Sequence, residues 1–301
     1  MKLPDFASLI LLGVLVVLAL FFIWRWWTIS RATPGGRERP DALDFGTGFV
    51  TNFFDTLGIG SFATTTAIFK FRRRMPDEQI PGTLNAGHAV PTFVQAFLFI
   101  ATVAVDVTTL IAMIFASVLG AWFGAGVVAR LPRRAIQLGM GLALLVAATL
   151  FVLANLKLIP GGGEALGLSG GLLALAVAIN FVLGALMTLG IGLYAPCLIT
   201  ISLLGMNPVV AFPIMMGSCA FLMPPAGVRF MARGRVNFAA MLGLTLGGIP
   251  AVLIAALLVR SLPLVLLRWL VVIVVIGAAV MMLRSALRAQ PQAALSSEVQ
   301  A

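Results

Sequence analysis

The sequence predicts an all-α polytopic membrane protein with two inverted-topology repeats and an extra N-terminal helix. Each predicted repeat is a re-entrant hairpin, broken by glycines, together with three transmembrane helices. Three observations lead to this prediction: the hydropathy of the chain, a duplicated glycine motif and the positions of the basic residues.

The hydropathy excludes a soluble globular protein. Of the 301 residues, 61% are apolar and only 10% are charged, and the mean hydropathy is +1.10. Apolar runs long enough to cross about 30 Å of hydrocarbon recur along the chain. The predicted apolar segments span residues 6–27, 44–69, 82–104, 107–129, 135–156, 168–204, 208–228, 237–259 and 265–287.

A duplicated motif divides the chain into two halves. The pentapeptide Thr-Leu-Gly-Ile-Gly occurs at Thr56–Gly60 and again at Thr188–Gly192, 132 residues later. The register holds beyond the motif without a gap, since Pro76 matches Pro208. Paired, glycine-interrupted apolar segments at corresponding positions of two halves are typical of the binding sites of membrane transporters.

The first apolar segment, residues 6–27, is expected to be a retained helix rather than a signal peptide. No small-residue cleavage signature follows it, and Trp24-Arg25-Trp26-Trp27 forms an aromatic and basic anchor at the membrane interface. We therefore assign residues 1–43 to an N-terminal transmembrane helix and a basic cytoplasmic loop.

The second apolar segment, residues 44–69, is predicted to enter the membrane and return to the same side. Basic clusters flank it at both ends, and the positive-inside rule places both clusters in the cytoplasm. A helix of about 26 residues folded in half reaches roughly to mid-bilayer. The turn then falls at Thr56–Gly60, where glycine adopts backbone angles that other residues resist.

The second copy of the hairpin, residues 168–204, is predicted to enter from the opposite side. Three crossings per half then invert repeat 2 (168–288) relative to repeat 1 (44–156). Residues 157–167 become an external linker and residues 289–301 a disordered cytoplasmic tail. The N-terminus is expected in the periplasm and the C-terminus in the cytoplasm.

This topology agrees with the charge distribution, because it leaves 16 of the 20 Lys and Arg residues in the cytoplasm. Those residues are Arg25, Arg31, Arg37, Arg39, Lys70, Arg72, Arg73, Arg74, Arg130, Arg133, Arg134, Arg229, Arg233, Arg235, Arg284 and Arg288.

Other partners and cofactors are not expected. The net charge of +10 arises from basic clusters between apolar segments, so the expected partners are the lipid bilayer and a small anionic substrate, not nucleic acid. Cys197 and Cys219 lie in apolar segments and suit small core residues better than a disulfide or a zinc site. No P-loop motif occurs, and neither a cofactor nor a metal is predicted.

The candidate site lies where the two glycine turns are expected to meet near the middle of the bilayer. Irregular backbone is tolerated there only when it is buried in protein or lines a wet cavity. Freed N–H groups would favour an anion, although freed carbonyls at the same breaks could hold a cation. The candidate substrate-binding residues are Asn52, Thr56, Gly58, Gly60, Thr64, Asn85, Thr188, Gly190, Gly192, Tyr194, Cys197 and Ser218.

Asp55 and His88 are the candidate proton-coupling residues. An ionised carboxylate deep in a membrane costs about 2.5–3.5 kcal/mol, so such residues usually face a pathway or a partner. The alternative for Asp55 is a wetted position at the cavity mouth or a structural role as an acceptor at the helix break. His88 is the only histidine, and imidazole titrates near neutral pH, but it could equally bond a neighbouring backbone carbonyl.

The two glycine-rich stretches, Gly48–Gly60 and Gly184–Pro196, resemble the duplicated signature of the TauE/SafE family of sulfite exporters and sulfur-anion permeases. The resemblance covers nearly the whole chain after residue 44. It implies a secondary transporter, not an enzyme, for small sulfur-containing anions such as sulfite, sulfonates or sulfoacetate. The expected location is the bacterial inner membrane, with coupling to an ion gradient.

Two other function classes stay open at this point. A cation-coupled permease for a cationic or neutral solute would use Asp55. An intramembrane enzyme with inverted hairpins would need Glu, Ser and Arg together at the turns, whereas Glu38, Glu78, Glu164 and Glu298 all lie in loops or the tail. The sequence also leaves the oligomeric state open, with a homodimer among the alternatives.

Overall fold

The fold is that of a helical bundle, described here from a computed structural model. The structure describes residues 6–124, 133–156, 158, 163–187, 193–261 and 264–288. Within these ranges every regular element is a helix, which confirms the predicted all-α class. The predicted tail, residues 289–301, and the second glycine motif, Thr188–Gly192, lie outside the described residues.

The first half of the chain contains α1 and the helices of predicted repeat 1. They are α1 (Phe6–Ala32), α2 (Ala42–Thr56), α3 (Phe62–Phe71), the 3-10 helix η1 (Asp77–Gln79), α4 (Ile80–Gly87), α5 (Ala89–Thr102), α6 (Val107–Leu119), the π-helix η2 (Gly120–Gly124) and α8 (Arg133–Asn155).

The second half contains the helices of predicted repeat 2. They are α9 (Gly170–Met187), α10 (Tyr194–Leu203), the 3-10 helix η3 (Pro208–Val210), α11 (Ala211–Ala232), α12 (Phe238–Ser261) and α13 (Leu264–Arg288). Several helix boundaries repeat at the spacing of the sequence motif. For example, α3 and α10 begin at Phe62 and Tyr194, 132 residues apart, and they have the same length of 10 residues.

Five helical stretches of the described ranges are long and apolar enough to cross a membrane, which supports a multi-pass membrane protein. They are Phe6–Ala32, Ile80–Thr102, Gly170–Met187, Pro208–Ala232 and Phe238–Leu258.

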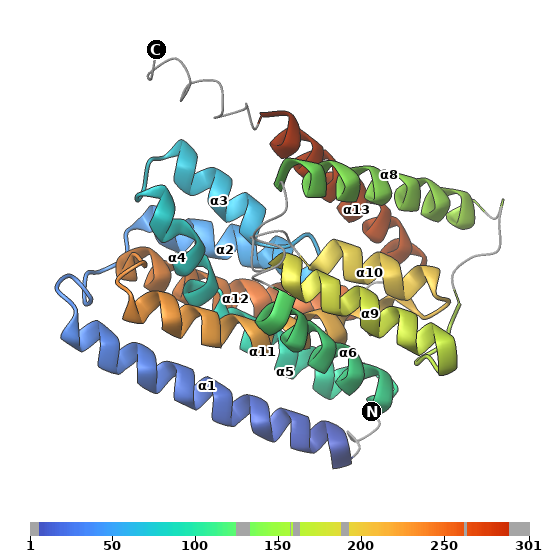
Figure 1. The fold of residues 1–301 in the computed structure, drawn as a ribbon, viewed down its shortest axis with the longest axis horizontal. Helices are drawn as coiled ribbons and strands as arrows, with labels where there is room; N and C mark the ends of the chain where they lie inside the picture. The colour runs from blue at the N-terminus through green and yellow to red at the C-terminus, as the bar shows by residue number, and fades with distance from the viewer. Residues whose placement is uncertain are drawn as a thin grey trace.

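The helix α11 lies inside the bundle, where it packs against α4, α5 and α6. In Figure 1, α1 runs along one side of the bundle and the paired helices α8 and α13 lie on the opposite side. Most of α1 is exposed, and its outward side chains are large and apolar. This surface suits contact with lipid rather than water.

The two halves exchange partners. Helix α2 of the first half packs against α12 of the second, and α9 of the second half packs against α6 of the first. Small residues allow both close approaches, because a Cβ atom added at Gly48 would lie 2.6 Å from Leu244 Cα, and one at Gly184 would collide with the Ser117 carbonyl oxygen. Each half is therefore completed by a helix of the other.

The first hairpin consists of α2, a glycine turn and α3. An N-terminal capping box formed by Asp41 and Asp44 starts α2. The chain then turns through Gly58 and Gly60, whose φ angles of 96° and 86° lie in the region that favours glycine. At 15 and 10 residues, the two arms are about 22 Å and 15 Å long, so each is shorter than the hydrocarbon core.

The two ends of this hairpin lie side by side. Arg74, just after α3, forms a bidentate ion pair with Asp44 near the start of α2, with Nε–Oδ1 and Nη2–Oδ2 distances of 2.9 and 2.6 Å. Hydrogen bonding to Asp44 also raises the pKa of the Arg74 guanidinium above its ordinary value. The hairpin therefore begins and ends at the same place in the bundle.

The second hairpin, α9 and α10, has the same property. The N–H of Asn207, after α10, donates to the carbonyl oxygen of Ala165, before α9, over 2.9 Å. One feature differs from the sequence prediction: α9 has 18 residues and is about 27 Å long, close to the thickness of the hydrocarbon core. Its length follows from an uncharged, proline-free sequence that offers no break before Met187.

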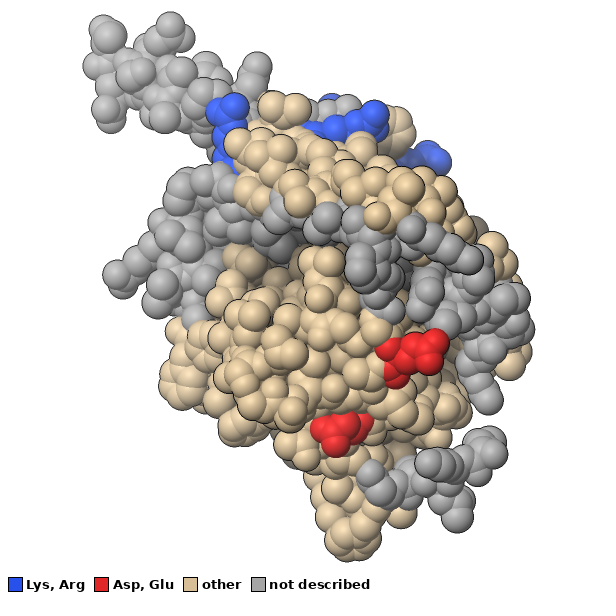
Figure 2. Space-filling model, turned by 90° about the vertical axis from the view of Figure 1, so that its right-hand side faces the viewer, with Lys and Arg blue, Asp and Glu red and all other residues tan. Residues whose placement is uncertain are grey.

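Figure 2 shows the end of the molecule at which α1 begins. Its described surface is largely uncharged, with acidic side chains on it and basic side chains only along the upper edge. This distribution agrees with the concentration of basic residues in loops at the other end of α1.

Candidate functional site

The turn of the first hairpin is closed by the side chain of Asp55. Its Oδ1 atom accepts a hydrogen bond of 2.6 Å from the backbone N–H of Ser61, six residues later. Positive φ angles at Gly58 and Gly60 bring Ser61 back to the end of α2. Asp55 is buried, and its carboxylate thus satisfies a backbone donor at the start of α3.

Gln95 of α5 connects this turn to the second half of the chain. Its Nε2 atom donates to Asp55 Oδ2 at 2.9 Å and to Thr56 Oγ1 at 2.8 Å. Its Oε1 atom accepts from the hydroxyl of Tyr194, the first residue of α10, at 3.0 Å. We call these four residues, Asp55, Thr56, Gln95 and Tyr194, the junction cluster, because they join both hairpins.

A second buried group surrounds His88, between α4 and α5. Its Nδ1 and Nε2 atoms each lie 3.0 Å from a partner, Asn52 Oδ1 and Thr65 Oγ1 respectively. The amide nitrogen of Asn52 donates to the Gly48 carbonyl, so its oxygen is the acceptor and the proton of this pair lies on His88 Nδ1. Both ring nitrogens of His88 are therefore used within the protein.

The second half contributes a smaller polar group. The Asn180 amide nitrogen donates to the Met113 carbonyl at 2.6 Å and to Ser218 Oγ at 3.3 Å. Its Oδ1 atom is buried and has no hydrogen-bond partner among the described residues. Cys219, next to Ser218, contacts Met187 through sulfur atoms 3.3 Å apart, and Cys197 is fully buried.

The structure brings together only part of the predicted residue set. Asp55, Thr56 and Tyr194 meet in the junction cluster, with Asn52 and His88 in the adjacent group. Gly58 and Gly60 form the turn beside them.

Four predicted residues take no part in either group: Ser218 lies beside Asn180, Cys197 is buried in the apolar core, and the other two are Thr64 and Asn85. The side chains of Thr64 and Asn85 bond the nearby carbonyls of Ser61 and Pro81. Thr188, Gly190 and Gly192 lie outside the described residues.

Gln95 lies at the centre of the junction cluster, but it was not among the residues predicted for the site. It lies seven residues after His88, and Thr92 lies between them at helical spacing, so the three share one face of α5. A buried amide on an otherwise apolar helix was the available signal. Its partners, however, are 39, 40 and 99 positions away in the sequence.

The chemistry of the junction cluster is that of neutral donors around one carboxylate. Asp55 is its acidic member, and the described donors to it are a backbone N–H and an amide N–H. Such donors bind anions without a fixed positive charge, and they stay available only while the site excludes water.

Membrane-length helices, paired hairpins and a buried polar junction define a multi-pass helical membrane protein. The family model of the sulfite exporter TauE/SafE family matches residues 2–151. Over these residues the chain belongs to the TauE/SafE family, as its first glycine motif predicts, and the family is one of membrane transporters. No curated protein and no solved structure matches the chain.

Proposed function

We propose that the protein is a secondary transporter of small sulfur-containing anions, such as sulfite and sulfonates, in the bacterial inner membrane. An ion gradient drives transport, and access alternates between the two sides as the inverted halves move. The family match supports a permease or exporter. The substrate class comes from the family description together with the neutral hydrogen-bond donors of the junction cluster.

The positions of the hairpin ends support the inverted arrangement. The first hairpin ends at Arg74, shortly before α4 begins at Ile80. The second begins beside Asp106, which follows α5 and donates its N–H to the Leu166 carbonyl at 2.8 Å. The two hairpins thus have their ends at opposite ends of the continuous α4–α5 stretch, Ile80–Thr102, which is long enough to cross the membrane.

The junction cluster is the observation that carries the transport proposal. It is buried and contains groups from both halves, linked by the hydrogen bond from Tyr194 to Gln95. If the halves rock against each other, this bond breaks and the donors of Gln95 and Ser61 become accessible. Binding at a place shared by two inverted halves is how alternating access operates.

Coupling follows from the position of Asp55. Its carboxylate occupies the Ser61 and Gln95 donors, which an anion would also use. In our proposal, protonation of Asp55 removes its charge and frees these donors, and the substrate anion takes them. One proton then accompanies each anion through the cycle, and release of both returns the carboxylate to its donors.

Flux into proteoliposomes tests this function. Under an imposed proton gradient, the wild type should accumulate sulfite or a sulfonate but not a carboxylate of similar size. Asp55→Asn, which cannot exchange a proton, should reduce this accumulation at least tenfold. A tenfold reduction corresponds to a free-energy difference of about 1.4 kcal/mol. Asp106→Asn makes the same change at the N-cap of α6, where Asn is an equally good cap, and should transport normally.

Normal gradient-driven accumulation by Asp55→Asn would contradict proton coupling through this residue. Transport of the carboxylate in preference to both sulfur anions would contradict the substrate class.

A second candidate function is the transport of a cation or a cation-coupled solute. The negative charge of Asp55 favours it, since a carboxylate at a helix break can bind a cation directly. In that case, the same assay would show cation flux that Asp55→Asn abolishes, with no effect of added sulfite.

A further inference from the structure

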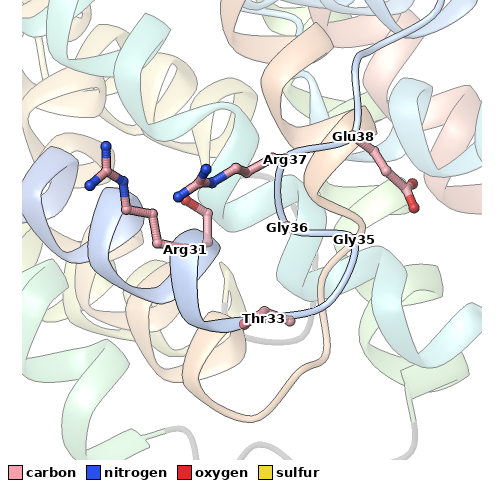
Figure 3. A pocket seen from close by; sticks show the side chains of 7 residues that line it. Arg31, Thr33, Gly35, Gly36, Arg37 and Glu38 are labelled. Carbon is pink, nitrogen blue, oxygen red and sulfur yellow. The ribbon is translucent and has the colours of Figure 1, made fainter.

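The end of α1 carries a hollow that the proposed transport function does not use. It lies between the last turn of α1 and the loop that leads to α2, and its volume is about 330 Å³. The lining residues are Ser30, Arg31, Thr33, Gly35, Gly36, Arg37 and Glu38. The Arg37 side chain reaches back toward the end of α1, where Arg31 lies, whereas the Glu38 carboxylate points the opposite way (Figure 3). Arg31 and Arg37 both line the hollow.

The positive charge of this hollow is not neutralised within the described part of the chain. Neither Arg31 nor Arg37 forms an ion pair there. The next carboxylate along the loop, Asp41, accepts the Asp44 N–H and lies 3.5 Å from Arg74. Two arginines and one glutamate, Glu38, line the hollow, so its lining carries a net positive charge, and neither guanidinium is paired with that glutamate.

The length of α1 places this hollow at the level of lipid headgroups. The helix has 27 residues and is about 40 Å long, whereas about 20 residues cross the hydrocarbon core. The last two turns therefore emerge from the hydrocarbon. Trp24 and Trp27 are about half exposed there, at 54% and 51%, as expected for aromatic residues at the membrane interface.

Arg31 is held by the aromatic anchor itself. It follows Trp27 by one helical turn, and its Cζ atom lies 3.7 Å from the centroid of the Trp27 ring. The guanidinium is thus positioned over an interfacial ring, with donors left for a ligand. The hydroxyls of Ser30 and Thr33 donate to carbonyls of their own helix, so the guanidinium groups supply the donors of the hollow.

We propose that this hollow binds the headgroup phosphate of an anionic phospholipid. A planar guanidinium matches two phosphate oxygens at once, and two such groups favour a lipid with net negative charge over a zwitterionic one. Basic residues directly beside a transmembrane helix recognise anionic headgroups in this way. The acyl chains would then lie along the exposed apolar face of α1.

Lipid titration of the purified full-length protein, followed by native mass spectrometry, tests this site. The wild type should bind phosphatidylglycerol more tightly than phosphatidylcholine with the same acyl chains. The double variant Arg31→Gln/Arg37→Gln should weaken phosphatidylglycerol binding about tenfold or more. The matched control is Arg25→Gln, because Arg25 also lies over a tryptophan ring, at 5.8 Å from Trp24, but does not line the hollow.

Each outcome decides the proposal. Equal loss of affinity in Arg25→Gln and in the double variant would show a diffuse charge effect and overturn it, as would equal binding of the two lipids by the wild type. Inorganic phosphate is the competing probe: if it displaces phosphatidylglycerol completely at millimolar concentration, the site is one for a soluble anion. If the double variant does not fold, Arg31→Lys/Arg37→Lys keeps the charge, and unchanged affinity in that variant would overturn guanidinium recognition.

Discussion

Gln95 uses both ends of its amide, and each end bonds a different half of the protein. The amide nitrogen donates to Asp55 and Thr56, and the amide oxygen accepts from Tyr194. Asp55 could be singled out from the sequence because a lone carboxylate in an apolar segment is costly. The sequence alone could not single out Gln95 in this way. A buried amide stabilises a protein only where hydrogen-bond partners surround it, and the partners of Gln95 are distant in the sequence.

Replacing Gln95 by Ala should therefore affect both stability and transport. The change removes the Gln95 donor from Asp55, which keeps only the Ser61 N–H, and the Gln95 acceptor from the Tyr194 hydroxyl. Each buried group that loses its hydrogen bond costs about 1–3 kcal/mol. We expect a lower thermal unfolding midpoint in detergent and at least tenfold slower flux in proteoliposomes. Gln79→Ala is the control, since the described hydrogen bonds of Gln79 use only its backbone, and it should change stability by less than about 0.5 kcal/mol. Wild-type flux in Gln95→Ala would exclude the junction cluster from the pathway.

At the scale of elements, the glycine breaks were predictable and the lengths of the arms were not. Glycines at positions 58 and 60 interrupt an apolar run, and the structure turns there with positive φ angles. The long arm α9 differs from α2, although the two occupy corresponding places. The packing of α9 on α6, which buries its C-terminal part from Ala176 onward, is not visible in the local sequence.

The Arg74–Asp44 pair holds the first hairpin closed at its base. Asp44 is fully buried and Arg74 is 26% exposed, so removal of the guanidinium leaves a buried carboxylate without its partner. Arg74→Gln should destabilise the protein by about 3 kcal/mol, and Arg74→Lys should rescue little, since lysine cannot form the bidentate contact. The pKa of Arg74 is raised, so the cation persists throughout the physiological pH range and this contribution is not lost as the pH rises toward 10.

Thermal unfolding in detergent measures this effect. Arg72→Gln is the matched control, because Arg72 is exposed two residues away, and its midpoint should stay close to that of the wild type. Equal midpoints for Arg74→Gln and Arg72→Gln would show that the pair does not stabilise the hairpin.

At the scale of the whole molecule, the exchange of partners between the halves organises the bundle. α2 requires α12, and α9 requires α6, so neither half buries its hairpin alone. The 132-residue register indicated two halves, but a repeat in the sequence does not state which helices pair. Contacts between residues far apart in the chain decide that.

Topology labelling tests the inverted arrangement directly. In a background without Cys197 and Cys219, a cysteine introduced at Arg72 reports the end of the first hairpin, and one at Glu164 reports the start of the second. Both positions are exposed. An impermeant thiol reagent added to intact cells should label the Glu164→Cys variant and not the Arg72→Cys variant. Labelling of both variants from the same side would contradict opposite entry of the hairpins.

By itself, the sequence determined that this is a helical membrane protein, that one glycine motif occurs twice in the chain and that glycines break the first hairpin. These properties follow from hydropathy, spacing and backbone freedom, which are local. Only the tertiary structure decided that Gln95 joins Asp55 to Tyr194, that His88 uses both ring nitrogens within the protein and that the halves exchange helices. These features are contacts across long stretches of chain, and a polar side chain acquires its partners only when packing brings them within hydrogen-bond distance.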